Sequence, residues 1–138
     1  MVSDSTLLAL QRATHATVHA LAAQVADLGL TPAEINALAN LAGARSQTVS
    51  ELGRLVGSPP TTLTSVLDRL ERRGHVTRDR HPTDRRAVLV SLTPSGRRAA
   101  ASIRRAITRL ERHALGDLDA ATIDGLRAGL DALAGAAP

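Results

Sequence analysis

The sequence predicts a mainly α-helical protein with a small β-hairpin. Apolar residues recur at spacings of three and four along most of the 138 residues, which is the period of a helix with one buried side. Several of these stretches begin with serine or threonine, followed by proline or by a capping glutamate, as helix starts do. Past the middle of the chain, two short runs, HVTR and AVLVSL, flank a polar loop and indicate a hairpin.

The first two helices are expected over 7–29 and over 32 to about 43. The apolar residues of the first helix form a seam like that of a coiled coil. The second helix follows a capping box made by Thr31 and Glu34, with Pro32 at its first position. Both starts and both apolar patterns therefore agree with helical structure.

Two further helices are expected on either side of a tight turn. The third, over 48–56, begins with a capping box at Thr48 and is expected to turn three apolar side chains inward, namely Leu52, Leu55 and Val56. The fourth runs over 59–73, where two prolines occupy a first turn that needs no N–H groups. The Ser58 hydroxyl is expected to cap Thr61. The buried stripe of this helix comprises Leu63, Val66, Leu67 and Leu70.

The hairpin strands are expected over 75–78 and 87–92. Thr93 and Pro94 then start a long helix with apolar residues on one side and arginines on the other, and a last helix begins near Asp119. Two helices joined by a tight turn and followed by a basic hairpin are the parts of a winged helix-turn-helix. The outer helices are left to form a separate layer.

The composition excludes several classes of protein. Without cysteine there is no disulfide framework, cysteine-ligated zinc module or thiol nucleophile. Without Phe, Tyr or Trp, a platform that stacks single-stranded bases is not expected. No apolar run approaches the roughly 18 residues of a membrane span, and Asp4 with no basic leader argues against a signal peptide. We therefore expect a soluble protein of the cytoplasm.

Positive charge is concentrated in one region of the chain. Residues 69–112 hold 13 arginines against four acidic residues, a net charge of +9, whereas the remainder has a net charge of −5. The chain contains no lysine. A GC-rich genome explains the choice of arginine over lysine, but it does not explain the clustering. Arginine suits bidentate contacts with phosphate and guanine, so the cluster favours a nucleic-acid partner.

The outer side of the helix over 59–73 is expected to face DNA. Opposite its buried stripe, it carries Thr61, Ser65, Asp68, Arg69 and Arg72, with Thr62 and Thr64 at the flanks. Small hydroxyls permit a close approach to a duplex, and arginines can reach a guanine edge or the backbone. The alternative is a polar face that only meets solvent, which is commoner among helices. The basic hairpin that follows favours the DNA interpretation.

The hairpin loop carries basic residues that cannot be buried. It reads RHPTDRR over 80–86, and arginines at such a tip suit the negative potential of a narrow minor groove. Asp84 is expected to accept hydrogen bonds from Arg86 or from loop amides and so to fix the shape of the tip. The alternative is that Asp84 only relieves repulsion among its arginine neighbours.

The motifs over 67–97 resemble the multiple-antibiotic-resistance regulator (MarR) family. They are LDRLERRG at 67–74 and DRRAVLVSLTPSGR at 84–97. The most specific part is the Asp-x-Arg wing followed by Leu-Thr-x-x-Gly-Arg, and the resemblance covers almost the whole chain. It implies a homodimeric winged-helix transcription factor, usually a repressor, with dimerisation helices in 1–30 and 95–138 around a DNA-binding domain at 31–94.

The resemblance also implies particular roles. Asp84 and Arg86 would build the wing, and Arg86, helped by Arg85, would enter the minor groove. Ser65 stands where many members carry arginine, which leaves base reading to Arg69, to the threonines or to DNA shape. Ligands of the family commonly bind between the dimerisation helices and the winged domain. The lack of cysteine excludes the family's thiol-oxidation sensing.

We expect no enzyme, cofactor or metal site. The sequence has no nucleophile elbow, Gly-rich phosphate loop or metalloprotease motif. His15 and His19 are four residues apart, as are His113 and Asp117, and such pairs can chelate a transition metal. Since no further ligands can be identified, we interpret these residues as lying on the surface or at an interface.

The sequence thus predicts a homodimeric repressor that binds a pseudo-palindromic operator and is released by a small molecule. The predicted DNA-contacting residues are Ser58, Thr61, Thr62, Thr64, Ser65, Arg69, Arg72, Asp84, Arg85 and Arg86. The main alternative is a dimeric ligand-binding or protein-interaction module that has lost operator recognition. A basic architectural protein that binds any duplex ranks last, because the chain lacks an apolar wedge.

Overall fold

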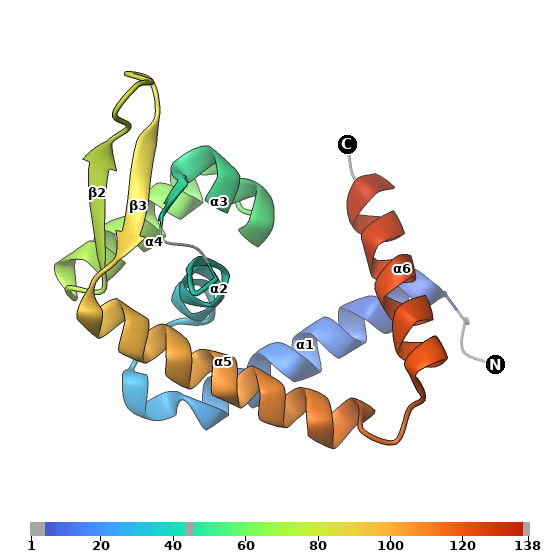
Figure 1. The fold of residues 1–138 in the computed structure, drawn as a ribbon. Coiled ribbons are helices and arrows are strands. Elements are labelled where there is room, and N and C mark those ends of the chain that lie inside the picture. Colours follow the sequence, from blue (N-terminus) through green and yellow to red (C-terminus); the bar gives the residue numbers. More distant parts are fainter. Residues whose placement is uncertain (1–4, 44–45, 137–138) are drawn as a thin grey trace.

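The computed structural model describes residues 5–43 and 46–136. Within these ranges the chain forms helices and a small sheet in the order α1 (Thr6–Gln24), α2 (Pro32–Leu41), β1 (Ser46–Thr48), α3 (Val49–Val56), α4 (Pro60–Arg72), β2 (Val76–Arg80), β3 (Val88–Leu92), α5 (Pro94–Leu115) and α6 (Ala120–Ala136). Figure 1 shows α2–α4 and the sheet gathered at one end and α6 at the other, with α1 and α5 spanning the distance between them. The predicted fold class, mainly helical with a basic hairpin, is confirmed.

The winged end contains the main hydrophobic core. Leu38 of α2, Leu52 of α3 and Leu67 of α4 are buried side by side, and Ile103 of α5 closes the cluster. The capping box predicted at the start of α2 forms in both directions, since the Glu34 amide donates to Thr31 Oγ1 and the Thr31 amide donates to Glu34 Oε1. The local capping signals and the packing of the core therefore favour the same helical segments.

The sheet has one more strand than the sequence indicates. Its order is β1-β3-β2, and both pairings are antiparallel, with Gln47 opposite Val90 and Arg78 opposite Val90 from the other side. β1 is three polar residues long and has no apolar alternation, so its pairing depends on tertiary contact with β3. The hairpin strands β2 and β3 each begin one residue later than predicted.

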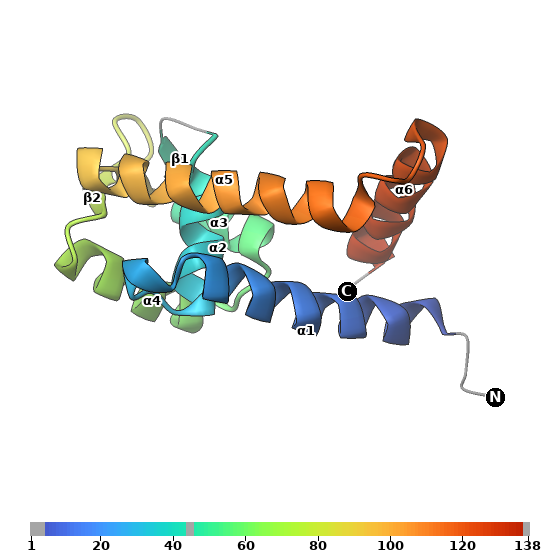
Figure 2. The ribbon, with the colours of Figure 1, turned by 90° about the horizontal axis from the view of Figure 1, so that it is seen from below.

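The outer helices α1 and α5 run side by side (Figure 2). α1 ends at Gln24, earlier than predicted, and a 3₁₀ turn over Ala26–Leu28 continues to Gly29, whose φ is 64°. Within this single chain, no described side chain of α1 or α6 is fully buried. Leu21 of α1 packs against the core, whereas Leu7 and Val18 of α1 and Leu126 and Leu130 of α6 remain exposed in the single chain.

One residue of α3 lies on the opposite side from that predicted. Leu52 is fully buried and Val56 is half-buried, but Leu55 is 58% exposed. α3 has only eight residues and packs one narrow side against its neighbours. Because successive residues of a helix point about 100° apart, Leu55 points to solvent although the next residue, Val56, is half-buried. Across residues 5–43 and 46–136, no helix is long and apolar enough to span a membrane.

Candidate nucleic-acid interface

The beginning of α4 differs from the prediction. The N-cap residue is Pro59 rather than Ser58, and no side chain caps the helix. The predicted hydrogen bond, from the Thr61 amide to the Ser58 hydroxyl oxygen, is thus absent, because the helix starts one residue later and a proline has no acceptor side chain. Amides that a cap would occupy remain directed out of the helix end, where an anion can meet them.

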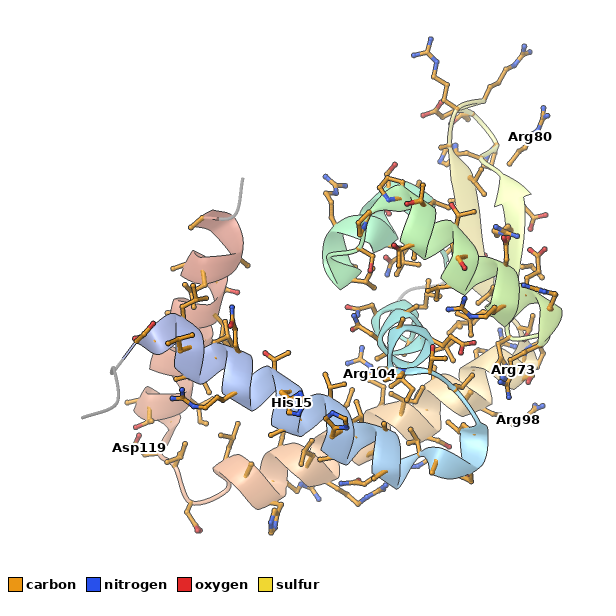
Figure 3. All side chains as sticks on the ribbon, turned by 180° about the vertical axis from the view of Figure 1, so that it is seen from behind. His15, Arg73, Arg80, Arg98, Arg104 and Asp119 are labelled. Carbon is orange, nitrogen blue, oxygen red and sulfur yellow. The ribbon has the colours of Figure 1, made fainter. Side chains whose placement is uncertain are left out.

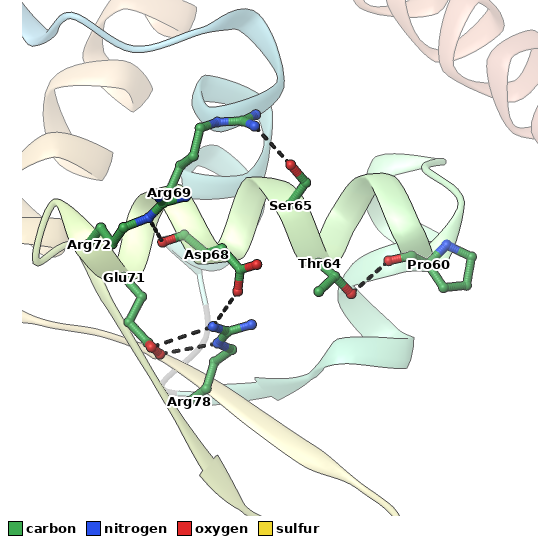
Figure 4. A network of polar contacts seen from close by, with 8 residues as sticks. All are labelled: Pro60, Thr64, Ser65, Asp68, Arg69, Glu71, Arg72 and Arg78. Atoms are coloured by element: carbon green, nitrogen blue, oxygen red, sulfur yellow. Dashed lines mark hydrogen bonds and ion pairs between the residues drawn. The ribbon is translucent and has the colours of Figure 1, made fainter.

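The hydroxyl residues of α4 line its outer edge as predicted. Thr61, Thr62, Thr64 and Ser65 are exposed, while Leu63, Val66, Leu67 and Leu70 are buried. Thr64 donates to the carbonyl oxygen of Pro60 at 2.9 Å, within its own helix (Figure 4). The exposed side chains of this edge are short, so the backbone of α4 can come close to another surface.

The two arginines predicted to reach DNA lie along α4 in this structure. Arg69 is half-buried, and its Nη1 donates to Ser65 Oγ at 3.0 Å. Its Nε is buried and has no hydrogen-bond partner among the described residues. Arg72 Nε donates to the carbonyl oxygen of Asp68 at 3.3 Å, and both contacts are visible in Figure 4.

An ion-pair network joins α4 to the wing strand β2. Arg78 Nη2 lies 2.6 Å from Asp68 Oδ1, and Arg78 Nε lies 3.1 Å from Glu71 Oε2 (Figure 4). The hydrogen bonds that Arg78 donates to these carboxylates, to that of Glu71 foremost, raise the pKa of Arg78. Sequence reasoning did not identify this network. The only signal was two acids three residues apart on α4, with an arginine in the next strand.

The wing tip is organised by its own polar residues. As predicted, a loop amide binds Asp84, since the Arg86 N–H donates to Asp84 Oδ1 at 3.0 Å. His81 Nδ1 accepts from the amides of Thr83 and Asp84 at 3.2 and 3.1 Å, a role that sequence reasoning missed. These bonds give the exposed loop a defined shape without burying it.

The arginines of the wing project away from the body. Arg80, Arg85 and Arg86 are exposed, and Figure 3 shows the Arg80 side chain extending from the wing. Thr64 of α4 and Arg86 of the wing line the same surface hollow of about 320 Å³. The hydroxyl edge and the arginine-bearing wing therefore lie next to one another on one surface.

The base of the wing is fixed to the start of α5. Thr93 Oγ1 donates to the Gly74 carbonyl at 2.5 Å, and Ser95 Oγ lies 2.9 Å from His75 Nδ1. Partial burial lowers the pKa of His75, the charge of Arg73 lowers it further, and Glu34 opposes the shift. A Cβ at Gly96 would lie 1.9 Å from the His75 carbonyl oxygen, so α5 meets the backbone here directly.

The hollows that border α1 lie away from this interface. An apolar groove of about 430 Å³ runs between α1, α5 and α6, with Val18, Leu110 and Leu126 among its lining residues. A second hollow, of about 410 Å³, lies between α1, α2 and α5 and is lined mainly by aliphatic side chains, with Thr14 and Asn36 as polar groups. This second hollow lies at the junction between the outer helices and the winged end.

The histidine pair on α1 is exposed, as interpreted from the sequence. The rings of His15 and His19 are in edge-to-face contact, with centroids 4.4 Å apart. Within the described ranges, no three histidine, aspartate or glutamate residues converge in a way that could hold a metal ion.

Known proteins resemble the chain over these same elements. The MarR family model matches residues 30–88. Two proteins of Bacillus subtilis (strain 168) are similar to this chain. The uncharacterized HTH-type transcriptional regulator YcgE is 41% identical over 78 residues, which make up 56% of this chain and 49% of that protein. The HTH-type transcriptional repressor MdtR is 37% identical over 68 residues, 49% of this chain and 44% of its own length. The chain thus matches about half the length of each.

A solved structure extends the similarity to the outer helices. A probable transcriptional regulator from Pseudomonas aeruginosa is 31% identical, with a TM-score of 0.78 over 96% of this chain and 99% of that one. The family match covers α2 to α4, β2 and the wing loop as far as Val88, and the structural match adds the layer of α1, α5 and α6. On both grounds, the chain belongs to the MarR family.

Proposed function

We propose that the chain is a homodimeric, sequence-specific DNA-binding regulator that represses nearby genes and is released by a small molecule. The observation that carries the proposal is the common surface of the α4 edge and the wing, where Thr64 and Arg86 border one hollow. A regulator of this kind acts on the chromosome, so its place in the cell would be the bacterial cytoplasm.

In the proposed complex, α4 enters the major groove with its N-terminal end first. The uncapped amides of the first turn meet phosphate, and the exposed hydroxyls of Thr61, Thr62 and Ser65 come close to base edges. Arg85 and Arg86 then reach the flanking minor groove from the wing, while Asp84 keeps the tip in shape. Arg69 reads a base after it exchanges its contact with Ser65 for one with DNA.

The homodimer is proposed to form through the apolar seam. Leu7, Val18, Leu126 and Leu130 are between 39% and 51% exposed in the single chain, and the groove between α1, α5 and α6 is mostly apolar. A contiguous apolar surface of this kind marks an interface. Two-fold symmetry then presents two α4 helices to half-sites about one helical turn apart.

The effector is proposed to bind in the hollow between α1, α2 and α5. Its walls include Leu21, Ile35 and Ile107, and Asn36 can donate or accept a hydrogen bond. An apolar molecule with one or two polar groups suits this lining. Because α2 belongs to the winged end and α1 to the outer layer, a ligand between them changes how the two are set against each other.

The deciding experiment selects a binding duplex from random 30-base-pair DNA with the full chain and then measures its affinity by fluorescence anisotropy. We expect binding to the selected duplex to be at least about 1000-fold tighter than to random duplex, and the affinity to fall steeply with salt. Equal affinity for both duplexes would reject specific regulation and favour an architectural protein. No duplex binding at all would favour the alternative below.

A second candidate is a ligand-binding module that no longer reads an operator. The contact of Arg69 with Ser65 favours it, since this arginine is held on the protein rather than extended. A thermal-shift screen for stabilising small molecules, followed by a DNA-binding assay, separates the two candidates. The screen uses an extrinsic dye, because the chain has no Trp or Tyr for intrinsic fluorescence. A stabilising small molecule that leaves the protein without DNA affinity in either state supports the module.

A further inference from the structure

One arginine joins the end of α4 to the end of the first helical segment. Arg73, the C-cap residue of α4, donates from Nη1 to the Gly29 carbonyl oxygen at 2.6 Å and from Nη2 to the Leu28 carbonyl oxygen at 3.0 Å. Gly29 and Leu28 are 44 and 45 residues away from Arg73 in the sequence. The contact therefore spans the winged end and the outer layer.

No other hydrogen bond joins residues 5–30 to the winged end in the part of the chain that the structure describes. The remaining contacts of the first segment with the winged end are apolar, through Leu21, Val25 and Leu28. Apolar packing has little directional preference, whereas two N–H donors on a planar guanidinium fix both distance and orientation. Arg73 therefore supplies the directional part of the contact.

The acceptor side is shaped for this contact. Gly29 has a φ of 64°, which turns the chain sharply at the end of the 3₁₀ turn and exposes the Leu28 and Gly29 carbonyl groups together. A Cβ at Gly29 would lie 3.3 Å from Arg73 Nη2. Glycine thus serves both the turn and the close approach of the guanidinium.

From this geometry we infer that Arg73 is a positioning residue that sets the angle of α4 relative to α1, and thereby the half-site spacing that the dimer accepts. The inference rests on the proposed function. With two recognition helices about 34 Å apart, a rotation of about 5° in each subunit about the two-fold axis, about 17 Å away, changes their separation by about 3 Å, close to the rise of one base pair. A small loss of angular control therefore changes which spacing fits.

The first test measures this angle without DNA. Because the chain has no cysteine, Thr62→Cys gives a single site on α4 for a nitroxide label, and double electron–electron resonance measures the distance between the two labels of a dimer. We expect one narrow distance peak in the otherwise unchanged chain. In the Arg73→Lys background, which keeps the charge but loses the planar fork, the peak should broaden or shift by about 3 Å or more.

The control is Arg98→Lys, on the exposed side of α5, which should leave the distance peak unchanged. Arg73→Ala, checked for folding by circular dichroism, should broaden the peak at least as much as Arg73→Lys. An unchanged peak in both Arg73 variants would overturn the inference. Absence of any distance between subunits would instead reject the proposed dimer.

The second test has a readout that a merely stabilising contact would not move. The duplex selected by the unaltered chain is lengthened or shortened by one base pair at its centre. We expect the unaltered chain to lose at least about tenfold in affinity and Arg73→Lys to lose less than about threefold. Equal losses in the two proteins would overturn the role of Arg73 and leave the regulator intact, whereas failure to select any duplex would reject the regulator itself.

Discussion

The two halves of α4 are built in opposite ways. The N-terminal half begins without a side-chain cap, and its outer side carries exposed hydroxyls such as Thr61 and Thr62. The C-terminal half is bound on two sides, to β2 through Asp68 and Glu71 and to the Leu28–Gly29 turn through Arg73. One half is left available to a partner, and the other is used to hold the helix in place.

Apart from Arg69, whose guanidinium reaches back to Ser65, this difference separates DNA reading from orientation within a single 13-residue helix. Changes in the bound half should alter stability and geometry first, whereas changes in the free half and the wing tip should alter affinity for DNA with little effect on folding. Each variant below tests that separation.

The largest effect is expected at the junction beneath the bound half. Gly96→Ala places a Cβ against the His75 backbone, which cannot move without shifting β2, and should lower the free energy of unfolding by about 2–4 kcal/mol. Urea unfolding followed by circular dichroism measures this. Gly125→Ala on α6, where an added Cβ would meet nothing beyond the helix's own backbone within 4 Å, is the control and should be neutral or slightly stabilising. Equal unfolding free energies of the two variants would show that α5 can shift away from the His75 backbone at no measurable cost.

At the wing tip, Arg86→Ala should weaken binding to the selected duplex by about tenfold to 100-fold and make the salt dependence shallower. The unfolding free energy and the dimer should not change, because the side chain is exposed and the Asp84 bond uses the Arg86 backbone. Arg127→Ala on α6 removes the same charge elsewhere and serves as the control. Undiminished duplex affinity in Arg86→Ala would place DNA away from the wing.

A smaller effect is expected from the link between α4 and β2. Arg78→Gln should lower the free energy of unfolding by about 1 kcal/mol or less, since Arg78 and its two partners are 25%, 46% and 44% exposed in their side chains. Thr62→Ala in the free half should change it by less than about 0.5 kcal/mol. The comparison is made by urea unfolding. A larger cost for Thr62→Ala than for Arg78→Gln would reverse the assignment of the two halves.

The smallest effect concerns pH. The pKa of His75 is lowered in the folded protein, so below pH 6.5 the unfolded chain binds this proton more readily than the folded chain does. Stability should therefore decline as the pH falls below the usual His value, and His75→Gln should flatten that decline. Urea unfolding from pH 5 to 8 measures the slope, with the exposed His113→Gln as the control. An unaltered slope in His75→Gln would assign the proton uptake to other groups.

Features that depend on neighbours in the sequence were predictable. The capping boxes at Thr31 and Thr48 form as the residues indicate. The buried stripe of α4 follows directly from its apolar spacing. Such features are decided within one or two helical turns, so the amino-acid order is sufficient to locate them.

Features that depend on distant partners were not predictable. β1 forms because β3 accepts it, and Leu55 is exposed because α3 packs on only one side. Of the candidate interface, the hydroxyl edge and the Asp84 contact were foreseen, but the bonds of Arg73 and Arg78 were not, since many arginines in the same region looked equivalent. Spatial proximity, rather than residue type, distinguishes them.

α5 runs without interruption for 22 residues, from the wing base at Pro94 to the far end of the molecule at Leu115. A helix of that length is about 33 Å long and bends little. It contacts the His75 backbone at one end and borders the apolar groove at the other. In the proposed dimer, a tilt imposed where the two subunits meet would therefore be carried to the arginines of the wing by one stiff helix with no hinge along its length.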